Sequence, residues 1–150
     1  MSEAAILLNE TLLSMLKSET FVLLNTVDAE TGGPTSTAIS WLYAVSPGTV
    51  RLAIDHRSRL VNNMKVNPLV TITLFGEGTV YAINGSAAVR QDPLEDVPFK
   101  MCCFDVEIIA VRNALFYGAQ LDSAPRYAKV YDGRAAEKLD GQVFAAMKKA

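Results

Sequence analysis

The sequence predicts a mainly β domain with flanking helices, organised as a small β-barrel. Short runs of β-favouring residues follow one another at close spacing, separated by turns rich in glycine and proline. Helical periodicity occurs only near the two ends and once in the middle. The 150 residues, 50% of them hydrophobic and 20% charged, are enough for one core and contain no internal repeat or linker. We therefore expect residues 1–150 to form a single domain.

Apolar periodicity predicts a helix near the start of the chain. Leucines and a methionine recur at helical spacing over residues 3–17. The period then changes, and residues 20–28 form an apolar, β-rich run that ends at the turn signal of residues 30–34. We expect a helical segment over residues 1–18 and a barrel core over residues 20–112.

Strict alternation predicts one continuous strand over residues 35–45. Its bulky face carries Ile39, Trp41 and Tyr43, and its small face carries Ser36, Ala38 and Ser40. A Ser-Pro-Gly turn then predicts a hairpin into a strand over residues 49–55.

A short helix and three further strands follow. Apolar residues at helical spacing predict a helix over residues 60–64, which an Asn-Pro pair ends. Strands are expected over residues 69–75 and 79–90, joined by a Gly-Glu-Gly turn, and over residues 101–112 after a proline-bearing connector.

The last part of the chain, residues 113–150, is expected to hold a connector and a helix. Residues 127–131 are a candidate short strand, and apolar spacing predicts a helix over residues 134–148. The adjacent Cys102 and Cys103 do not suit an ordinary disulfide, and at least one is expected to be a small buried hydrophobe.

Composition and charge exclude several function classes. The 14 Lys and Arg against 16 Asp and Glu give a net charge of −2, which argues against a nucleic-acid partner. No apolar stretch is long enough for a membrane helix, and the N-terminus lacks a signal-peptide pattern. A cytoplasmic protein without a membrane partner is expected.

The familiar catalytic and metal motifs are missing from the sequence. It contains no Gly-rich dinucleotide fingerprint, no Gly-Lys-Ser/Thr phosphate loop and no Gly-x-Ser-x-Gly turn. One histidine and two adjacent cysteines cannot supply a usual zinc site. We therefore expect no metal, and we assign no catalytic residue; His56, the single histidine, is the one candidate for acid-base chemistry and is expected to be a solvated loop residue.

Residues 55–59, Asp-His-Arg-Ser-Arg, stand where a predicted strand ends and a helix begins. A helix N-terminus offers unpaired N–H groups, Ser58 can cap it or donate its hydroxyl, and Arg57 and Arg59 suit phosphate oxygens. These residues predict a phosphate site. The alternative is an ordinary capped helix with two solvated arginines.

The small side chains on one face of the strand over residues 35–45 leave its backbone N–H and C=O groups accessible. A flat ring system with polar edges could bind to such a surface. An exposed strand face that binds nothing is the alternative. Trp41 and Tyr43 are expected in the core or at a subunit interface rather than as a stacking platform. Asn62 and Asn63 could reach a ligand, but they are expected to be solvated.

In chain order, four segments resemble the pyridoxamine 5′-phosphate oxidase-like family, the flavin-binding split barrels. The segments are Pro34–Trp41, Arg51–Arg59, Asn67–Leu74 and Ala82–Ala87, and the resemblance covers residues 10–112. It implies a six-stranded split β-barrel of the FMN-binding split-barrel type. It also implies a homodimer with FMN held in a groove between the subunits.

The resemblance also implies a cofactor site. It places the FMN phosphate at Ser58 and Arg59 and the isoalloxazine edge near residues 38–41 and 53–55. The cofactor-binding residues expected are Ala38, Ile39, Ser40, Trp41, Ala53, Ile54, Asp55, Arg57, Ser58 and Arg59.

The chain lacks two basic residues that the oxidases of this family usually carry. Where they usually carry an arginine on the first ligand-facing strand, this chain has Ala38, and where lysine often follows Ser-Arg, it has Leu60. Arg57 could replace only one of these cations. The C-terminal Trp/Arg segment of the true oxidases is also missing, which argues against oxidation of pyridoxamine phosphate itself.

The resulting hypothesis is a cytoplasmic, FMN-dependent oxidoreductase. One alternative keeps the fold without catalysis, as a flavin- or haem-binding or ligand-free stress-type module. Another is a reductase that uses the deazaflavin F420, and FAD is a further alternative cofactor. The sequence does not indicate the substrate or the electron donor.

Overall fold

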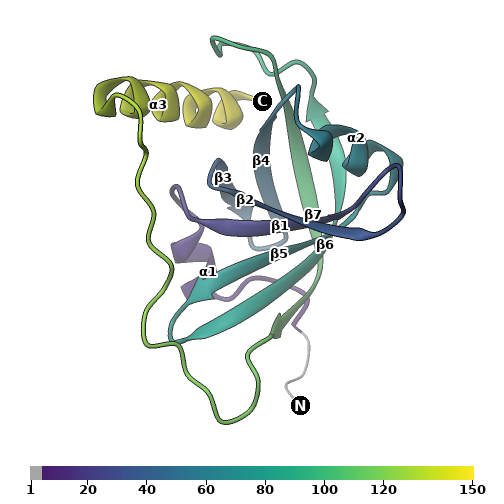
Figure 1. Ribbon diagram of the computed structural model, residues 1–150, viewed down its shortest axis with the longest axis vertical. Coiled ribbons are helices and arrows are strands. Elements are labelled where there is room, and N and C mark those ends of the chain that lie inside the picture. Colours follow the sequence, from purple (N-terminus) through teal and green to yellow (C-terminus); the bar gives the residue numbers. More distant parts are fainter. Residues whose placement is uncertain (1–4) are drawn as a thin grey trace.

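One antiparallel sheet dominates the computed structural model, which describes residues 5–150 (Figure 1). Across these residues the seven strands lie in the order β2-β1-β5-β6-β7-β4-β3. The strands are β1 (Val22–Val27), β2 (Pro34–Ile39), β3 (Leu42–Ser46), β4 (Thr49–Asp55), β5 (Leu69–Gly76), β6 (Thr79–Gln91) and β7 (Met101–Asn113). The helices are α1 (Glu10–Met15), α2 (Arg59–Val66) and α3 (Gly133–Lys149). The mainly β class with flanking helices is confirmed.

The prediction of one strand over residues 35–45 is wrong, because the chain forms two strands there. β2 pairs with β1, with Ile39 opposite Val22, whereas β3 pairs with β4, with Leu42 opposite Leu52. The two strands lie at opposite edges of the sheet. Alternation of bulky and small residues continues through both, so it does not reveal that the pairing partner changes. The six-strand count is wrong for the same reason.

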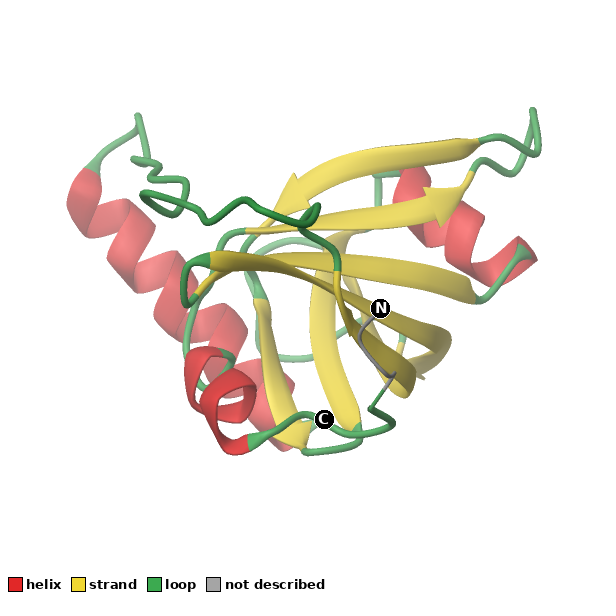
Figure 2. Cartoon of the chain, turned by 90° about the horizontal axis from the view of Figure 1, so that it is seen from below, coloured by secondary structure: helices red, strands yellow, loops and turns green. Residues whose placement is uncertain are grey.

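Ser40 and Trp41 connect β2 to β3 and thus carry the chain from one edge of the sheet to the other. The two edges therefore meet at this junction, and the strands curve around an interior (Figure 2). The N–H of Ala53 donates to the carbonyl of Trp41 at 3.1 Å and ties the junction to β4. The predicted common face of bulky residues is not formed, because Ile39 packs against the main core and Trp41 and Tyr43 against a second one.

The main core fills the inner side of the sheet, with α1 and α2 contributing to it. Its largest buried side chains are Leu12, Leu16, Leu24, Leu42, Leu52, Met64, Ile72, Leu74, Ile83 and Phe104. The helix predicted over residues 3–17 is shorter in the structure. Asn9 caps α1, and Ala5 instead forms a β-bridge with Val111. Residues 3 and 4 of that prediction lie outside the described residues.

A second core lies between α3 and the ends of β4 and β7. It contains Ala53, Leu94, Met101, Cys103, Val143, Ala146 and Met147. The C-terminal helix is thereby confirmed, as are the other predicted strands and the short middle helix, with small differences at their ends. No helix within the described residues is long and apolar enough to cross a membrane.

The segment between β7 and α3 is extended and runs along one side of the molecule (Figure 1). The short strand predicted over residues 127–131 is wrong, because these residues form no ladder with the sheet. Residues 122–131, which we call the strap, make no backbone hydrogen bond to another main-chain group of the described chain. Side chains must therefore hold the strap in place.

Cys102 and Cys103 are both buried and unbridged, which confirms their expected character as small hydrophobes. Burial raises the pKa of Cys102 to about 11 and that of Cys103 to about 12, because it disfavours the charged thiolate. Since the thiolate is the reactive form, we expect the native protein to react only slowly with Ellman's reagent at about pH 8. After unfolding in guanidinium chloride, two thiols per chain should react at once. Fast labelling of the native protein would contradict this burial.

Candidate functional site

A cavity of about 400 Å³ opens beside the β2–β3 junction. It is bounded by residues from β2, the junction, the end of β4, the start of α2 and the strap. Its lining residues are Thr37, Ile39, Ser40, Trp41, Ala53, Ile54, Asp55, Ser58, Leu60, Lys129 and Tyr131. The exposed surface of the lining is largely apolar, and polar groups contribute the rest. Its volume lies within the range typical of small-molecule sites.

A second cavity of about 200 Å³ adjoins the first one. The two share Thr37, Ser58 and Leu60, so they meet where α2 begins. The smaller cavity is more polar and is completed by Thr35, Arg59 and Asn63. Together the cavities form an apolar compartment beside a polar one.

Ser58 is the N-cap of α2, as the sequence predicts. Its extended backbone (φ −71°, ψ 141°) leads into the helix, and its Oγ accepts a hydrogen bond from the N–H of Leu60 at 3.2 Å. A serine hydroxyl that accepts in this way retains its own hydrogen for donation. Ser58 can therefore cap the helix and contact a ligand at the same time.

Arg57 forms an ion pair within its own loop. Its Nη2 lies 2.9 Å from Oδ2 of Asp55, and its backbone N–H donates to Oδ1 of the same carboxylate at 2.9 Å. These hydrogen bonds hold the pKa of Asp55 below its ordinary value. The Arg57 side chain is 89% exposed and belongs to neither cavity lining. Its environment matches the alternative of a solvated arginine.

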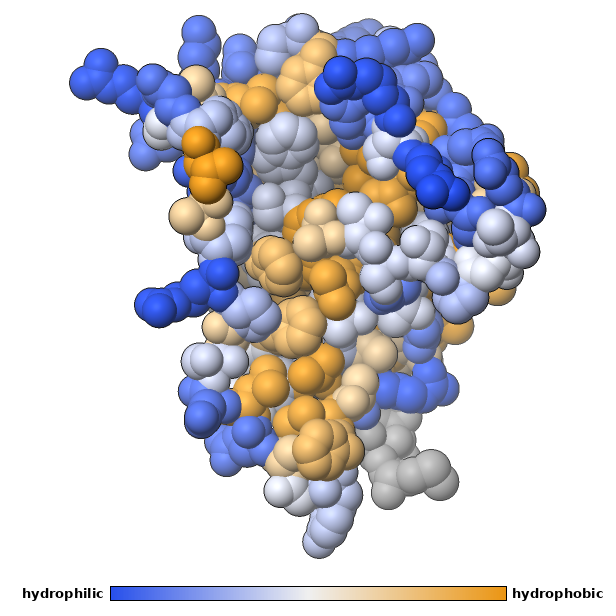
Figure 3. All heavy atoms as spheres, in the orientation of Figure 1, coloured by the Kyte–Doolittle hydropathy of each residue, from blue (hydrophilic) through white to orange (hydrophobic). Residues whose placement is uncertain are grey.

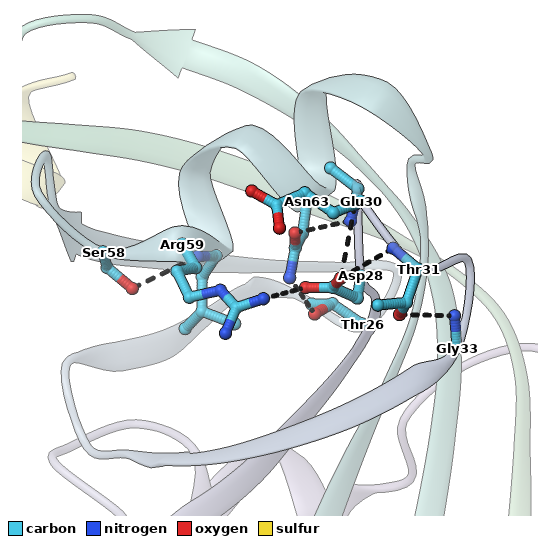
Figure 4. Close-up of polar contacts among 10 residues, drawn as sticks. Thr26, Asp28, Glu30, Thr31, Gly33, Ser58, Arg59 and Asn63 are labelled. Atoms are coloured by element: carbon cyan, nitrogen blue, oxygen red, sulfur yellow. Dashed lines mark hydrogen bonds and ion pairs between the residues drawn. The ribbon is translucent and has the colours of Figure 1, made fainter.

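Arg59 is paired with a residue far away in the sequence. Its Nη2 donates to Oδ1 of Asp28 in the β1–β2 turn, as Figure 4 shows. Oδ2 of Asp28 accepts from the N–H groups of Thr31 at 2.9 Å and Glu30 at 3.3 Å. The pKa of Asp28 is lowered, first by the Thr31 backbone hydrogen bond and also by the Arg59 charge. The turn and the start of α2 are thus joined by one carboxylate.

Asn63 adds a second link between α2 and the same turn (Figure 4). The side chain is buried; its Nδ2 donates to Oγ1 of Thr26 at 3.1 Å, and its Oδ1 accepts from the N–H of Ala29 at 2.9 Å. The expectation that Asn63 is solvated is wrong. It lies one helical turn after Arg59, on the face that meets β1.

The lowered pKa of Asp28 has a consequence for stability at acid pH. A carboxylate whose pKa is lower in the folded protein than in the unfolded chain stabilises the fold at pH values above its ordinary pKa of 3.8. That contribution is lost as the pH falls through the pKa of the folded state. We expect the free energy of unfolding to drop between about pH 5 and about pH 3, and to drop less in Asp28→Asn. Urea unfolding at the two pH values measures this. Identical acid sensitivity of both proteins would contradict the role of Asp28.

The structure brings most of the predicted cofactor residues together. The larger cavity is lined by Ile39, Ser40, Trp41, Ala53, Ile54, Asp55 and Ser58 from that set, and the smaller one by Ser58 and Arg59. Ala38 and Arg57 belong to neither lining. His56 also lies outside both, with its Nε2 3.1 Å from Oδ1 of Asp92.

Sequence reasoning left six residues of the cavity walls out of the predicted set, namely Thr35, Thr37, Leu60, Asn63, Lys129 and Tyr131. Thr37 lies on β2 beside the predicted Ala38, and alternation places it with Ile39 on the face opposite the small residues. Lys129 and Tyr131 come from the strap, where no periodic pattern marks a functional residue. Only the folded chain places the strap beside the β2–β3 junction.

Solved structures share this fold at low sequence identity. A provisionally assigned pyridoxamine 5′-phosphate oxidase from Lactobacillus delbrueckii is 19% identical, with 74% of this chain and 99% of that chain aligned at a TM-score of 0.63. The General Stress Protein 26 from Bacillus anthracis is 13% identical, with 67% and 88% aligned and a TM-score of 0.55. An F420 reductase is 19% identical, with 66% and 94% aligned and a TM-score of 0.52.

Two comparisons of the sequence itself add to the comparison of structures. No curated protein matches the chain. The sequence model of one family, described as pyridoxamine 5′-phosphate oxidase, does match it over residues 8–108. This range includes β1 to β6, α2, both ends of the β2–β3 junction and most of β7. The match spans more than half of the chain and agrees with the resemblance of its four segments, and the protein therefore belongs to the pyridoxamine 5′-phosphate oxidase family.

Proposed function

We propose that the protein is a cytoplasmic flavoprotein of the FMN-binding split-barrel type and that it acts as an oxidoreductase. The observation that carries the proposal is the pair of adjoining cavities. FMN consists of a flat, largely apolar ring system joined to a phosphate by a polar chain. An apolar compartment of about 400 Å³ that leads into a polar one at a helix N-terminus matches this distribution of chemistry.

The residues of the polar compartment suit a phosphate. The Ser58 hydroxyl keeps a hydrogen to donate, and α2 contributes the partial positive charge of its N-terminus. Only Nη2 of Arg59 is engaged with Asp28 among the described residues, which leaves Nε and Nη1 for phosphate oxygens. Asp28 already accepts two backbone N–H groups and does not need the whole guanidinium.

The residues of the apolar compartment suit the ring. Ile39, Ala53 and Ile54 would pack against its faces and exclude water, and Trp41 would complete the wall at the β2–β3 junction. Bound FMN supplies hydride or electron transfer, and the protein orients it. We assign no acid or base to the chain, and His56 lies outside both cavity linings.

We infer a substrate other than pyridoxamine phosphate. Leu60, at the position where lysine often follows Ser-Arg, is buried between the cavities. Ala38 is exposed and lies outside both cavities, and Arg57 turns to Asp55. The two positions therefore supply no cation to the polar compartment, and the chain also lacks the C-terminal Trp/Arg segment of the true oxidases.

The proposed assembly is a homodimer. The outward sides of β1, β5 and β6 carry partly exposed apolar residues, including Leu23, Phe75 and Val80. Figure 3 shows hydrophobic residues gathered on this side of the molecule. Apolar surface of this kind is typical of contact between chains. Light scattering after size exclusion should give twice the mass of one chain, and a monomeric mass would contradict the proposal.

The visible spectrum of the purified protein and a titration with FMN test the function directly. We expect flavin absorption bands, or saturable quenching of FMN fluorescence at one FMN per chain. A haem Soret band would support the haem-binding alternative, and exclusive binding of the deazaflavin F420 would support the reductase alternative. A colourless protein that binds none of FMN, FAD or F420 would overturn the proposal of a flavin site.

A further inference from the structure

Three charged residues from separate parts of the chain meet beside the larger cavity. Lys129 of the strap places its Nζ 2.6 Å from Oε2 of Glu19, which precedes β1. The same Nζ lies 2.6 Å from Oδ1 and 2.7 Å from Oδ2 of Asp140 on α3. All three side chains are less than a quarter exposed. We call these three residues the clasp.

The chemistry of the clasp indicates a positioning role for Lys129. A lysine ammonium has three N–H donors, and the three short contacts to carboxylate oxygens account for all of them. Burial alone would lower the pKa of Lys129, but the hydrogen bonds to Asp140 and Glu19 outweigh it and hold the pKa above its ordinary value. Lys129 therefore stays charged and has no donor left for a ligand.

The clasp is hydrogen-bonded to the β2–β3 junction, which lines the cavity. Ser40 donates from Oγ to Oε2 of Glu19 at 2.7 Å, and Trp41 donates from Nε1 to Oδ1 of Asp140 at 2.9 Å. Each carboxylate thus joins Lys129 to one residue of the cavity wall. The indole orientation of Trp41 is fixed by the carboxylate that Lys129 neutralises.

Lys129 is also the main anchor of the strap. Every other residue of the strap is exposed, and the strap makes no main-chain hydrogen bond to the backbone elsewhere in the described chain. One aromatic contact adds to the clasp: the rings of Tyr127 and Phe21 lie 5.5 Å apart. Without the Lys129 ion pairs, little would hold Tyr131 against the cavity.

We propose that Lys129, through Glu19 and Asp140, positions the ring end of the cofactor site. It holds the strap as one wall of the larger cavity and fixes Ser40 and Trp41 as another. The strap and α3 lie beyond residues 8–108, outside the part of the chain that the family model matches. That the ligand is FMN rests on the proposed function. That the cavity wall is closed rests on the contacts of the clasp alone.

Lys129→Met tests the clasp, with Lys129→Arg as the charge-preserving variant and Lys138→Met on the exposed side of α3 as the matched control. Trp41 is the single tryptophan of the chain, so its fluorescence reports on the cavity without any cofactor. In Lys129→Met we expect stronger quenching of Trp41 by acrylamide and at least about fivefold faster trypsin cleavage after Arg126. Lys129→Arg and Lys138→Met should behave as the original protein does. Unchanged quenching and cleavage in Lys129→Met, with a native far-ultraviolet spectrum, would overturn the proposal.

An FMN titration of the same variants separates the clasp from the function. We expect about tenfold weaker FMN binding in Lys129→Met, because the cavity wall is no longer organised in advance, and near-original binding in Lys129→Arg. Equal FMN affinity in the original protein and in Lys129→Met would overturn the positioning role. If no variant binds FMN, the proposed function fails, and the cofactor-free measurements on Trp41 and Arg126 still decide whether Lys129 closes the wall.

Discussion

Replacing Ser58 and Arg59 together with alanine is expected to weaken FMN binding about 10- to 100-fold, since charge-assisted hydrogen bonds contribute roughly 1.5–3 kcal/mol. The double variant removes the hydroxyl donor and the guanidinium at the point where the two cavities meet. The apolar side chains of the larger cavity are left in place. The loss should therefore be confined to the phosphate end of the ligand.

Riboflavin, which has the ring but no phosphate, is the matched ligand for this prediction. The original protein should bind FMN more tightly than riboflavin, and the double variant should bind the two almost equally. Fluorescence titration with both ligands measures the difference. An unchanged preference for FMN in the double variant would place the phosphate elsewhere on the protein.

Helix capping must be kept apart from phosphate binding in this test. Loss of the Ser58 cap alone costs about 1 kcal/mol of stability, and that could disturb the site indirectly. Ser58→Asp keeps a good cap but adds a negative charge, so it should preserve the urea unfolding midpoint and still weaken FMN binding. Weak binding together with retained stability would assign the effect to the phosphate.

The sequence locates the β4–α2 junction well because its signals are local. A β run, a serine and a helical pattern follow one another within residues 49–64, and each signal depends only on its neighbours. The structure confirms the strand, the cap and the helix there. It also brings this junction to the cavities, where the resemblance places the cofactor.

The partners of the two arginines could not be predicted in the same way. Arg59 binds Asp28, which lies 31 positions away and meets it only because the β1–β2 turn folds against α2. The residues next to them in the sequence therefore suggest that Arg57 and Arg59 are both available to bind a ligand. In the folded chain each has a carboxylate partner, and Arg59 alone lies at a cavity.

The pairing partners of the strands and the position of the strap could not be predicted from the sequence, for a related reason. Periodicity tells which way a side chain points but not which strand lies beside it, so the change of partner between β2 and β3 leaves no trace. The strap has no hydrophobic period at all. Its position depends on the contacts of Lys129 with Glu19, which lies 110 positions away in the sequence, and with Asp140, which lies 11 positions away. The cavity wall that these contacts build is visible only in three dimensions.

Gly85→Ala is expected to destabilise the fold by about 1–3 kcal/mol, although it adds a single methyl group. Gly85 stands in β6 where the register with β7 shifts. A Cβ there would clash with Cγ1 of Val106 and would lie 2.7 Å from the carbonyl oxygen of Glu107. The second neighbour is backbone in the centre of the sheet, so it cannot move aside cheaply. Close approach of two strands therefore explains the glycine in the segment that resembles the family.

The same substitution at Gly141 is the control for this argument. Gly141 lies inside α3, and a Cβ there would meet nothing within 4 Å. Alanine favours the helix over glycine by about 0.5–1 kcal/mol, so Gly141→Ala should stabilise the protein. Urea unfolding followed by circular dichroism would then show opposite shifts for one chemical change. If Gly85→Ala were as well tolerated as Gly141→Ala, β6 and β7 would not pack as closely as the structure has them, and the glycine would need another explanation.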